Sequence, residues 1–313
     1  MKHNIKIIAI LLTMFLVSQL IGIFIIGIYS PQVSQVIDDE GNLLNVTSYN
    51  LPYGMEPPEG VSPAGTLISI AIAIAIAVVV ILLLMKFKVE LFLRLWFFAV
   101  VTLALAISLN AIFFKFQLPS AAIIAIAIAL PLAFIKIFKR NIIVHNITEL
   151  AIYPGIAAIF VPLLNIWTVV LLLILISIYD MYAVWKAGFM QKMAQYHIEK
   201  LRLFPGFFLP TLGKKQKAMM KDAKTSPSKA KKLKDKKIKV NVAILGGGDV
   251  VFPMILAGVV LNTLGLLPAL IIVAGATAAL ATLFYYSKKG KSYPAMPFIT
   301  IGSLIALGIA FLI

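Results

Sequence analysis

Nine long apolar runs dominate this chain and constrain its fold more than any other feature of the sequence. A helix needs about 20 mainly apolar residues to cross the hydrocarbon core of a bilayer. Each run is close to that length, so the sequence predicts an all-α membrane protein with nine transmembrane helices. The predicted spans are residues 5–28, 67–84, 91–114, 121–138, 142–162, 166–185, 242–264, 268–286 and 296–313.

The charges of the chain agree with a multi-pass membrane protein. Only 13% of the residues are charged and 61% are hydrophobic, a balance that a soluble domain of 313 residues does not need. The net charge of +16 does not indicate nucleic acid, because the lysines and arginines cluster in connections between apolar runs. We therefore expect the lipid bilayer as a partner and no nucleic acid. The absence of cysteine excludes disulfides, thiolate nucleophiles and cysteine-based metal sites.

Basic residues fall on every second connection between the predicted spans. The connection at 31–65, by contrast, contains no Lys or Arg. Because Lys and Arg are enriched in cytoplasmic loops, this alternation predicts a cytoplasmic N-terminus and an external C-terminus. We expect the protein to lie in the cell membrane.

The longest connection divides the chain into three predicted parts. Residues 1–187 form a six-span bundle, residues 188–240 form a cytoplasmic connection, and residues 241–313 form a three-span unit. Apolar and charged side chains mix over 186–208, which predicts an amphipathic helix at the membrane interface. The lysine-rich, polar stretch 211–239 is expected to be disordered.

Two aspartates, Asp180 and Asp249, lie inside predicted spans, whereas most of the 12 acidic residues lie in loops or at span ends. A carboxylate near the bilayer centre costs roughly 2.5 to 3.5 kcal/mol, so a pair at depth indicates function. A helical rise of about 1.5 Å per residue places them about 9 Å and about 15 Å from their cytoplasmic flanks. Their spans run antiparallel, so the two side chains can meet if the helices are neighbours. Glu149 is shallower and is expected to snorkel or to pair near the interface.

Two carboxyl groups at close range have a defined chemistry. They do not both ionise readily, so the pair shares one proton. The ionised partner can activate water while the protonated partner donates to a carbonyl oxygen. The protons belong to the pair, so neither residue is assigned as the base or the acid. The sequence contains no H-E-x-x-H zinc motif and no G-x-S-x-G motif, and we expect neither a metal nor a cofactor.

Short motifs accompany both aspartates, and a third stands near the C-terminus. Tyr179 precedes Asp180 and can donate a hydrogen bond close to the site. Glycines before Asp249 allow another backbone to approach. They are Gly246, Gly247 and Gly248. The last predicted span opens with two prolines, which prevent a regular helix start and leave backbone groups for protein or water to pair. This segment is Pro294, Ala295, Met296 and Pro297.

Together these segments resemble the YD, GxGD and PAL motifs of the presenilin and signal peptide peptidase family of intramembrane aspartyl proteases. The order of the motifs, the spans that carry them and the hydrophilic loop before the seventh span agree over essentially the whole chain. Two positions depart from the usual pattern, because Met296 stands where Leu is usual and Gly247 where a bulkier residue is common. The predicted orientation is similar to that of presenilin-like members, and the compact loops are similar to those of microbial presenilin homologues.

The resemblance implies a role for each segment. Asp180 and Asp249 would be the catalytic dyad of an aspartic endopeptidase. Tyr179, the three glycines and the proline-containing segment would position the substrate. Substrates are expected to be single transmembrane helices of other proteins, locally unwound before cleavage, and homo-oligomerisation is left open.

The aspartate pair has two other interpretations. Prepilin peptidases also use a GxGD aspartate, but they have fewer spans and lack a PAL element. A proton- or cation-coupled transporter or channel could use the same buried acids. Such a protein would more often contain inverted repeats, and the sequence has no convincing internal repeat. The protease is therefore favoured, with ion-coupled transport as the alternative.

Overall fold

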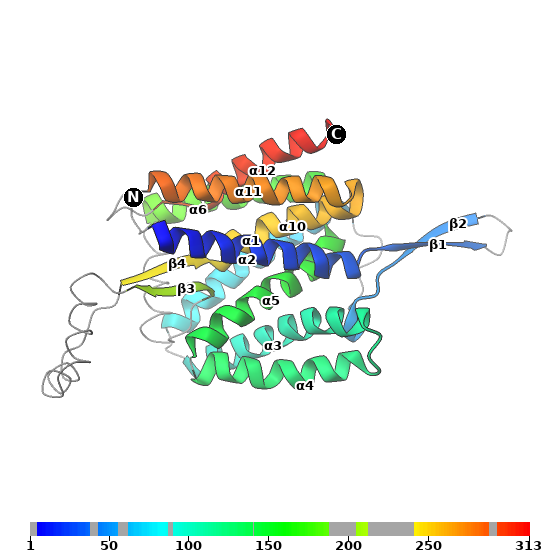
Figure 1. Cartoon of the computed structure of the whole chain (residues 1–313), viewed down its shortest axis with the longest axis horizontal. Helices are drawn as coiled ribbons and strands as arrows, with labels where there is room; N and C mark the ends of the chain where they lie inside the picture. The colour runs from blue at the N-terminus through cyan, green and yellow to red at the C-terminus, as the bar shows by residue number, and fades with distance from the viewer. Residues whose placement is uncertain are drawn as a thin grey trace, which may run out of the picture.

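The computed structural model of the chain describes residues 5–37, 43–55, 62–86, 90–139, 141–187, 205–211, 241–287 and 293–313. In this part of the chain the α-helices form one bundle (Figure 1). Their bounds are α1 Ile5–Ile28, α2 Pro63–Lys86, α3 Glu90–Lys115, α4 Ala121–Phe134, α5 Ile142–Phe160, α6 Ile166–Tyr182, α10 Gly247–Leu264, α11 Leu266–Tyr286 and α12 Met296–Ala310.

Shorter elements lie at the ends of the helices. Two antiparallel strand pairs, β1 with β2 and β3 with β4, extend from opposite ends of the bundle (Figure 1). The strands are β1 Gln32–Ile37, β2 Leu43–Ser48, β3 Gly206–Thr211 and β4 Asn241–Gly246. Single turns of 3-10 helix lie at Pro52–Gly54 and Val161–Leu163, and π-helical turns lie at Ile135–Lys139 and Ala183–Ala187.

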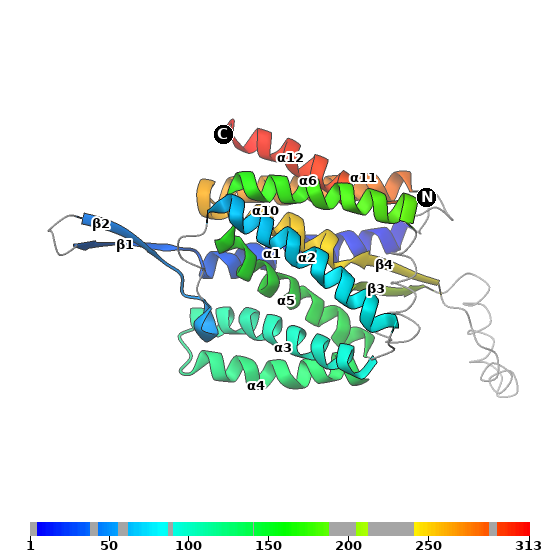
Figure 2. The same ribbon diagram turned by 180° about the vertical axis from the view of Figure 1, so that it is seen from behind.

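The helix α10 occupies the centre of the bundle. It contacts α1, α5, α6, α11 and α12. The pair α3 and α4 packs on one side of this centre, while α11 and α12 lie on the other (Figure 1). The helices α2 and α6 lie on the face turned away from α1 (Figure 2).

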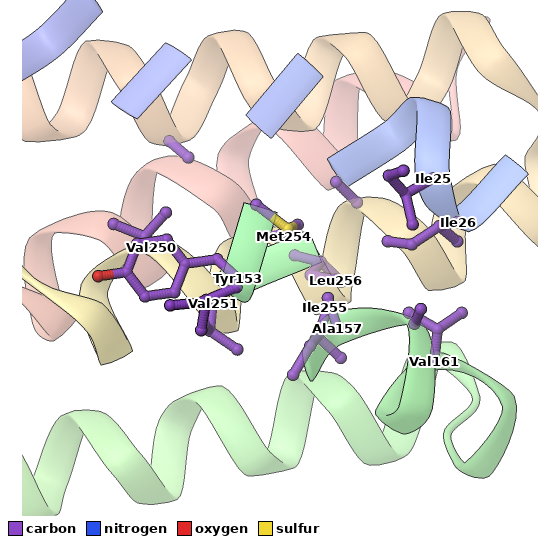
Figure 3. Packing of buried hydrophobic residues seen from close by; sticks show 14 of the residues in the cluster. Ile25, Ile26, Tyr153, Ala157, Val161, Val250, Val251, Met254, Ile255 and Leu256 are labelled. Carbon is purple, nitrogen blue, oxygen red and sulfur yellow. The ribbon is translucent and has the colours of Figure 1, made fainter. Parts of the chain in front are cut away.

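Apolar side chains of α1, α5 and α10 form the core around this central helix (Figure 3). Small residues let the helices approach closely, as is common where helices pack within a membrane. A Cβ atom at Gly258 of α10 would lie 2.6 Å from Cγ2 of Val161 and 2.7 Å from Cδ1 of Ile26. The labelled residues of the cluster are Ile25, Ile26, Tyr153, Ala157, Val161, Val250, Val251, Met254, Ile255 and Leu256.

Seven helices in the described residues are long and apolar enough to cross a membrane. Apolar helices at Ala64–Val80 and Met296–Ala310 are shorter. The chain is thus an integral, multi-pass membrane protein of largely helical fold. The count of nine spans, the orientation of the termini and the three-part division of the chain stay predictions.

The boundary between the fifth and sixth predicted spans has a clear physical cause. The 3-10 turn at Val161–Leu163 ends α5, and Asn165 then caps α6. The Asn165 side chain accepts from the Thr168 backbone N–H at 2.9 Å, and the Thr168 hydroxyl accepts from the Asn165 N–H at 2.9 Å. This reciprocal capping box satisfies donors that a helix start otherwise leaves unpaired.

The structure corrects two sequence predictions near the longest connection. The predicted span 242–264 is wrong at its start, because residues up to Gly246 belong to β4 and the helix begins at Gly247. The predicted amphipathic helix 186–208 is wrong at its end, because residues from Gly206 onward belong to β3. In both places strand pairing supplies the backbone hydrogen bonds that a helix would supply. The part of this prediction at 188–204 lies outside the described residues. The predicted disorder at 211–239 also lies outside them except for Thr211, where it is wrong because Thr211 belongs to β3.

Candidate active site

Asp249 lies where β4 turns into α10. Gly246 ends the strand and caps the helix with extended backbone angles, φ −63° and ψ 145°. Asp249 is therefore the third residue of the helix, and its carboxylate oxygen Oδ2 lies back toward Gly246. An acidic side chain at this position satisfies an unpaired N–H of the helix start and interacts favourably with the helix dipole. The sequence-based depth of Asp249 assumed an unbroken helix from the flank, and that assumption is wrong because residues up to Gly246 form a strand.

The three glycines before Asp249 face different neighbours. A Cβ atom at Gly246 would lie 3.1 Å from the Asp249 carboxylate oxygen Oδ2. At Gly247 it would lie 3.0 Å from ring carbon Cε1 of Tyr153. At Gly248, which is exposed, it would meet only the Phe252 ring, at an ordinary 3.5 Å. The first glycine thus leaves room for the carboxylate, the second is packed by Tyr153, and the third leaves an exposed backbone.

Asp180 is held by the start of α12. Its side chain is buried, and its Oδ2 accepts a hydrogen bond from the Met296 backbone N–H at 3.1 Å. The Ala295 backbone lies close to the same carboxylate. Helix starts leave N–H groups without intrahelical partners, and a carboxylate is a favourable acceptor for them. The proline-containing segment therefore reaches Asp180 through its backbone, while Pro294 and Met296 themselves are buried and Pro297 is partly buried.

The two aspartates lie at the same end of the bundle as β3 and β4. Their helices, α6 and α10, are in contact, and the two carboxyl groups lie within electrostatic range of each other. Tyr179 is partly exposed beside Asp180 and also interacts with it electrostatically. The structure thus brings the YD, GxGD and PAL-like segments together around one site.

Two hydrogen bonds that support this site were not predicted from the sequence. Ser177, one helical turn before Asp180, has its hydroxyl 2.7 Å from that of Thr300, so α6 is tied to α12. The buried Gln19 of α1 donates to the Val250 carbonyl at 2.8 Å, which ties α1 to the turn that carries Asp249. The only sequence signal for either bond is a hydroxyl or amide side chain within an apolar run. Such a side chain does not identify the group to which it will bond.

The described residues contain no group of three or more His, Asp or Glu side chains that could hold a metal ion. At the site itself the structure places two carboxyl groups and backbone N–H groups.

The chain is similar to known proteins of one family. The family model described as signal-peptide peptidase, presenilin aspartyl protease matches residues 43–313. No curated protein matches the chain. Among solved structures, a presenilin family intramembrane aspartate protease in a C222 crystal is similar over 97% of this chain and 98% of its own, with 18% identity and a TM-score of 0.60. A presenilin family intramembrane aspartate protease in a P2 crystal is similar over 96% of each chain, with 18% identity and a TM-score of 0.59.

The structural similarity, at this level of identity, shows a shared fold. The family model covers more than half of the chain and includes all three motifs. The family that the motifs predicted is therefore confirmed, and the chain belongs to the signal-peptide peptidase and presenilin family of aspartyl proteases.

Proposed function

We propose that this protein hydrolyses peptide bonds within transmembrane helices of other membrane proteins, with Asp180 and Asp249 as its catalytic dyad. The observation that carries the proposal is that the two carboxyl groups lie within electrostatic range of each other at one end of the bundle, each beside the backbone of a helix start. Family membership supports the same activity. No described feature favours the alternative of ion-coupled transport.

The proposed chemistry follows from one shared proton. The ionised carboxylate takes a proton from water, and the resulting hydroxide oxygen attacks the carbonyl carbon of the substrate. The protonated partner donates its proton to the carbonyl oxygen, which gives a neutral tetrahedral diol. As the C–N bond breaks, the amide nitrogen receives the proton that the first carboxylate took from water and leaves as the amine. The second carboxylate takes a proton from a hydroxyl of the diol, so the carbonyl of the new carboxylic acid forms and the pair again shares one proton. The protein supplies two carboxyl groups and their orientation, and no covalent intermediate forms.

The backbone contacts suggest how each carboxylate is oriented. Oδ2 of Asp180 faces the Met296 N–H, and Oδ2 of Asp249 lies beside Gly246. The second oxygen of each group is then available for water and for the substrate carbonyl. Groups that are fixed before the reaction lower its barrier because they need little rearrangement.

The proposed substrate is a transmembrane helix that unwinds near the site. In a helix the carbonyl groups are bonded within the backbone, so a water molecule reaches the carbonyl only after local unwinding. The exposed backbone at Gly248 offers a place where an extended substrate segment can approach Asp249. Tyr179 and the proline-containing segment would border that segment on the other side of the site.

Cleavage of a single-span model substrate by purified protein in liposomes tests the proposal. Products of the parent and of Asp180→Asn and Asp249→Asn would be identified by mass. These variants keep the shape of each side chain and remove its charge, so we expect the products to vanish in both. Equal cleavage by parent and variants would contradict the proposal, and ion flux without peptide products would favour transport.

A further inference from the structure

A buried charged cluster lies on α5 and the π-helical turn after α4. The Lys136 ammonium is 2.6 Å from Oε1 of Glu149, and these side chains are only 5% and 2% exposed. Nδ1 of His145 lies 3.2 Å from the same ammonium nitrogen. Burying a charge pair requires further hydrogen bonds, and replacing one by apolar residues is often no less stable. Stability alone therefore does not explain why these three side chains are polar.

The geometry fixes the direction of the histidine hydrogen bonds. An ammonium group has only donors, so Nδ1 of His145 accepts from Lys136. The proton of the neutral ring is then on Nε2, which lies 2.8 Å from the Gly206 carbonyl oxygen and donates to it. Glu149 accepts from the Gly206 N–H at 3.4 Å. Both backbone groups of Gly206, the first residue of β3, thus face this cluster.

Asn146 extends the same contact by one more step along the strand. Its side-chain amide donates to the Phe208 carbonyl at 2.9 Å and accepts from the Phe208 N–H at 3.0 Å. Side chains of α5 therefore bind the backbone of β3 in the way that a neighbouring strand would. We call His145, Asn146 and Glu149 the α5 clasp.

The α5 clasp is connected to Asp249 through short contacts. Gly206 pairs with Gly246 in the β3–β4 ladder. The Gly247 N–H donates to the Pro205 carbonyl at 3.1 Å, directly before the clasped residue. Tyr153, one helical turn beyond Glu149, packs its ring edge-on against Phe207 with centroids 5.5 Å apart. The same ring lies against Gly247, as described above.

We propose that the α5 clasp consists of positioning residues that hold β3 against α5 and thereby fix the turn carrying Asp249. Lys136 sets the tautomer of His145 and balances the charge of Glu149. This role rests on the proposed function of Asp249, because it explains how that carboxylate keeps its orientation toward the substrate. None of the three side chains of the clasp needs to touch the substrate.

Kinetics of His145 variants test the positioning role. His145→Leu removes the donor to Gly206, whereas in His145→Gln the side-chain amide can still donate to it. A misplacement of about 1 Å at a catalytic group costs about 100-fold in rate, so we expect the leucine variant to lose about 10- to 100-fold in kcat. Its KM should change by less than about threefold, because substrate-binding surfaces are unaltered. The glutamine variant should recover most of the loss.

A matched control separates positioning from general destabilisation. Tyr29, at the opposite end of the bundle, is also buried, donates to the Ile107 carbonyl at 2.8 Å and accepts from Asn110 at 2.9 Å. Tyr29→Phe removes buried hydrogen bonds without approaching either aspartate. We expect it to lower thermal stability and to leave kcat within about twofold of the parent. Equal kcat losses in Tyr29→Phe and His145→Leu would overturn the positioning role.

Hydrogen exchange supplies a readout that does not depend on activity. In an Asp249→Ala background, His145→Leu should speed exchange of the Phe208 and Gly247 amides by about tenfold or more, while Tyr29→Phe should not. If His145→Leu does not fold, Asn146→Ala replaces it in this experiment, because Asn146 lies outside the charged cluster. Unchanged exchange at both amides would overturn the inference even if the protease is active. If Asp249→Asn cleaved the model substrate as well as the parent does, the proposed function would be contradicted. The amide exchange rates would still show whether the clasp holds β3.

Discussion

The two aspartates stand on helices with very different surroundings. The helix α10 is enclosed by five other helices, and Met254, Leu256 and Val260 on it are fully buried. The helix α6 packs mainly on α12, α10 and α2 and leaves much of its surface open. Trp167 is 77% exposed and Ile178 is 63% exposed. One half of the site is thus part of the core, and the other half lies at the edge of the bundle.

This difference indicates how each carboxylate is placed. Asp249 is fixed by the path of its own backbone, from β4 into the first turn of α10. Asp180 is fixed by hydrogen bonds to another helix, through the Met296 N–H and the Ser177–Thr300 pair. A segment with few buried neighbours opens at lower free energy than one in the core. We therefore expect substitutions in the packed core around α10 to act mainly on folding, and substitutions that remove the hydrogen bonds holding Asp180 to act mainly on catalysis.

The largest effect on stability is expected at the buried ion pair of Lys136 and Glu149, since Glu149 lies on α5, a neighbour of α10. Glu149→Ala would leave the Lys136 ammonium buried without its carboxylate, which should lower the free energy of unfolding by about 3 to 5 kcal/mol. Unfolding in detergent, followed by circular dichroism, measures this change. The double variant Lys136→Met/Glu149→Gln removes both charges and should be close to the parent in stability. A single variant as stable as the double one would show that the pair is not buried in the folded protein.

The next effect concerns the tight packing of α10 on α1 and α5. Gly258→Leu would force side-chain atoms into Val161 and Ile26, which should cost about 1 to 3 kcal/mol or more. Gly308→Leu on α12 is the matched control, because a Cβ atom there meets nothing within 4 Å. Thermal unfolding of both variants tests the comparison. Similar losses at the two positions would contradict the distinction between the core helix and the edge.

A smaller loss of stability, combined with a larger loss of activity, is expected between α6 and α12. Ser177→Ala removes a hydrogen bond to Thr300, which is worth about 1 kcal/mol to folding. Because the bond ties Asp180 to the helix that orients it, product formation should fall by about tenfold. Thr282→Ala is the control, since its exposed hydroxyl bonds only to the Ala278 carbonyl of its own helix. An activity loss in Thr282→Ala equal to that in Ser177→Ala would refute the link.

The smallest effect is expected on the open face of α6. Trp167→Ala should change the free energy of unfolding by no more than about 0.5 kcal/mol in detergent, because the side chain has few protein neighbours. Leu172→Ala on the buried face of the same helix should cost about 2 to 5 kcal/mol. The two unfolding curves together map which face of α6 belongs to the bundle. A large effect of Trp167→Ala would mean that this face is packed in the folded protein.

The positions of most helices could be predicted from the sequence, because hydropathy responds to the bilayer and not to details of packing. The strand at Val242–Leu245 could not be predicted from the sequence, although its residues are all apolar. A run of four apolar residues fits a strand or a helix equally well. Only pairing with Phe207 and Leu209, far earlier in the chain, decides between them.

The same limit applies to the site. Asp180 and Asp249 could be singled out because an acid in an apolar span is costly by itself. Their supporting contacts depend on residues distant in sequence, such as the Met296 N–H, which is 116 residues from Asp180, or Gly206, which is 61 residues from His145. Serine, histidine and asparagine have many structural roles, so their partners appear only in the fold.

The pairing of Thr211 with Asn241 places the two ends of the long connection side by side. Because the connection from β3 to β4 begins and ends at paired residues, its length does not determine where Asp249 lies. A polypeptide opened there would give two fragments, one with Asp180 and one with Asp249, that still share the strand ladder and the contacts of α10 with α1, α5 and α6. We expect the halves, when coexpressed as separate chains, to assemble into one complete site.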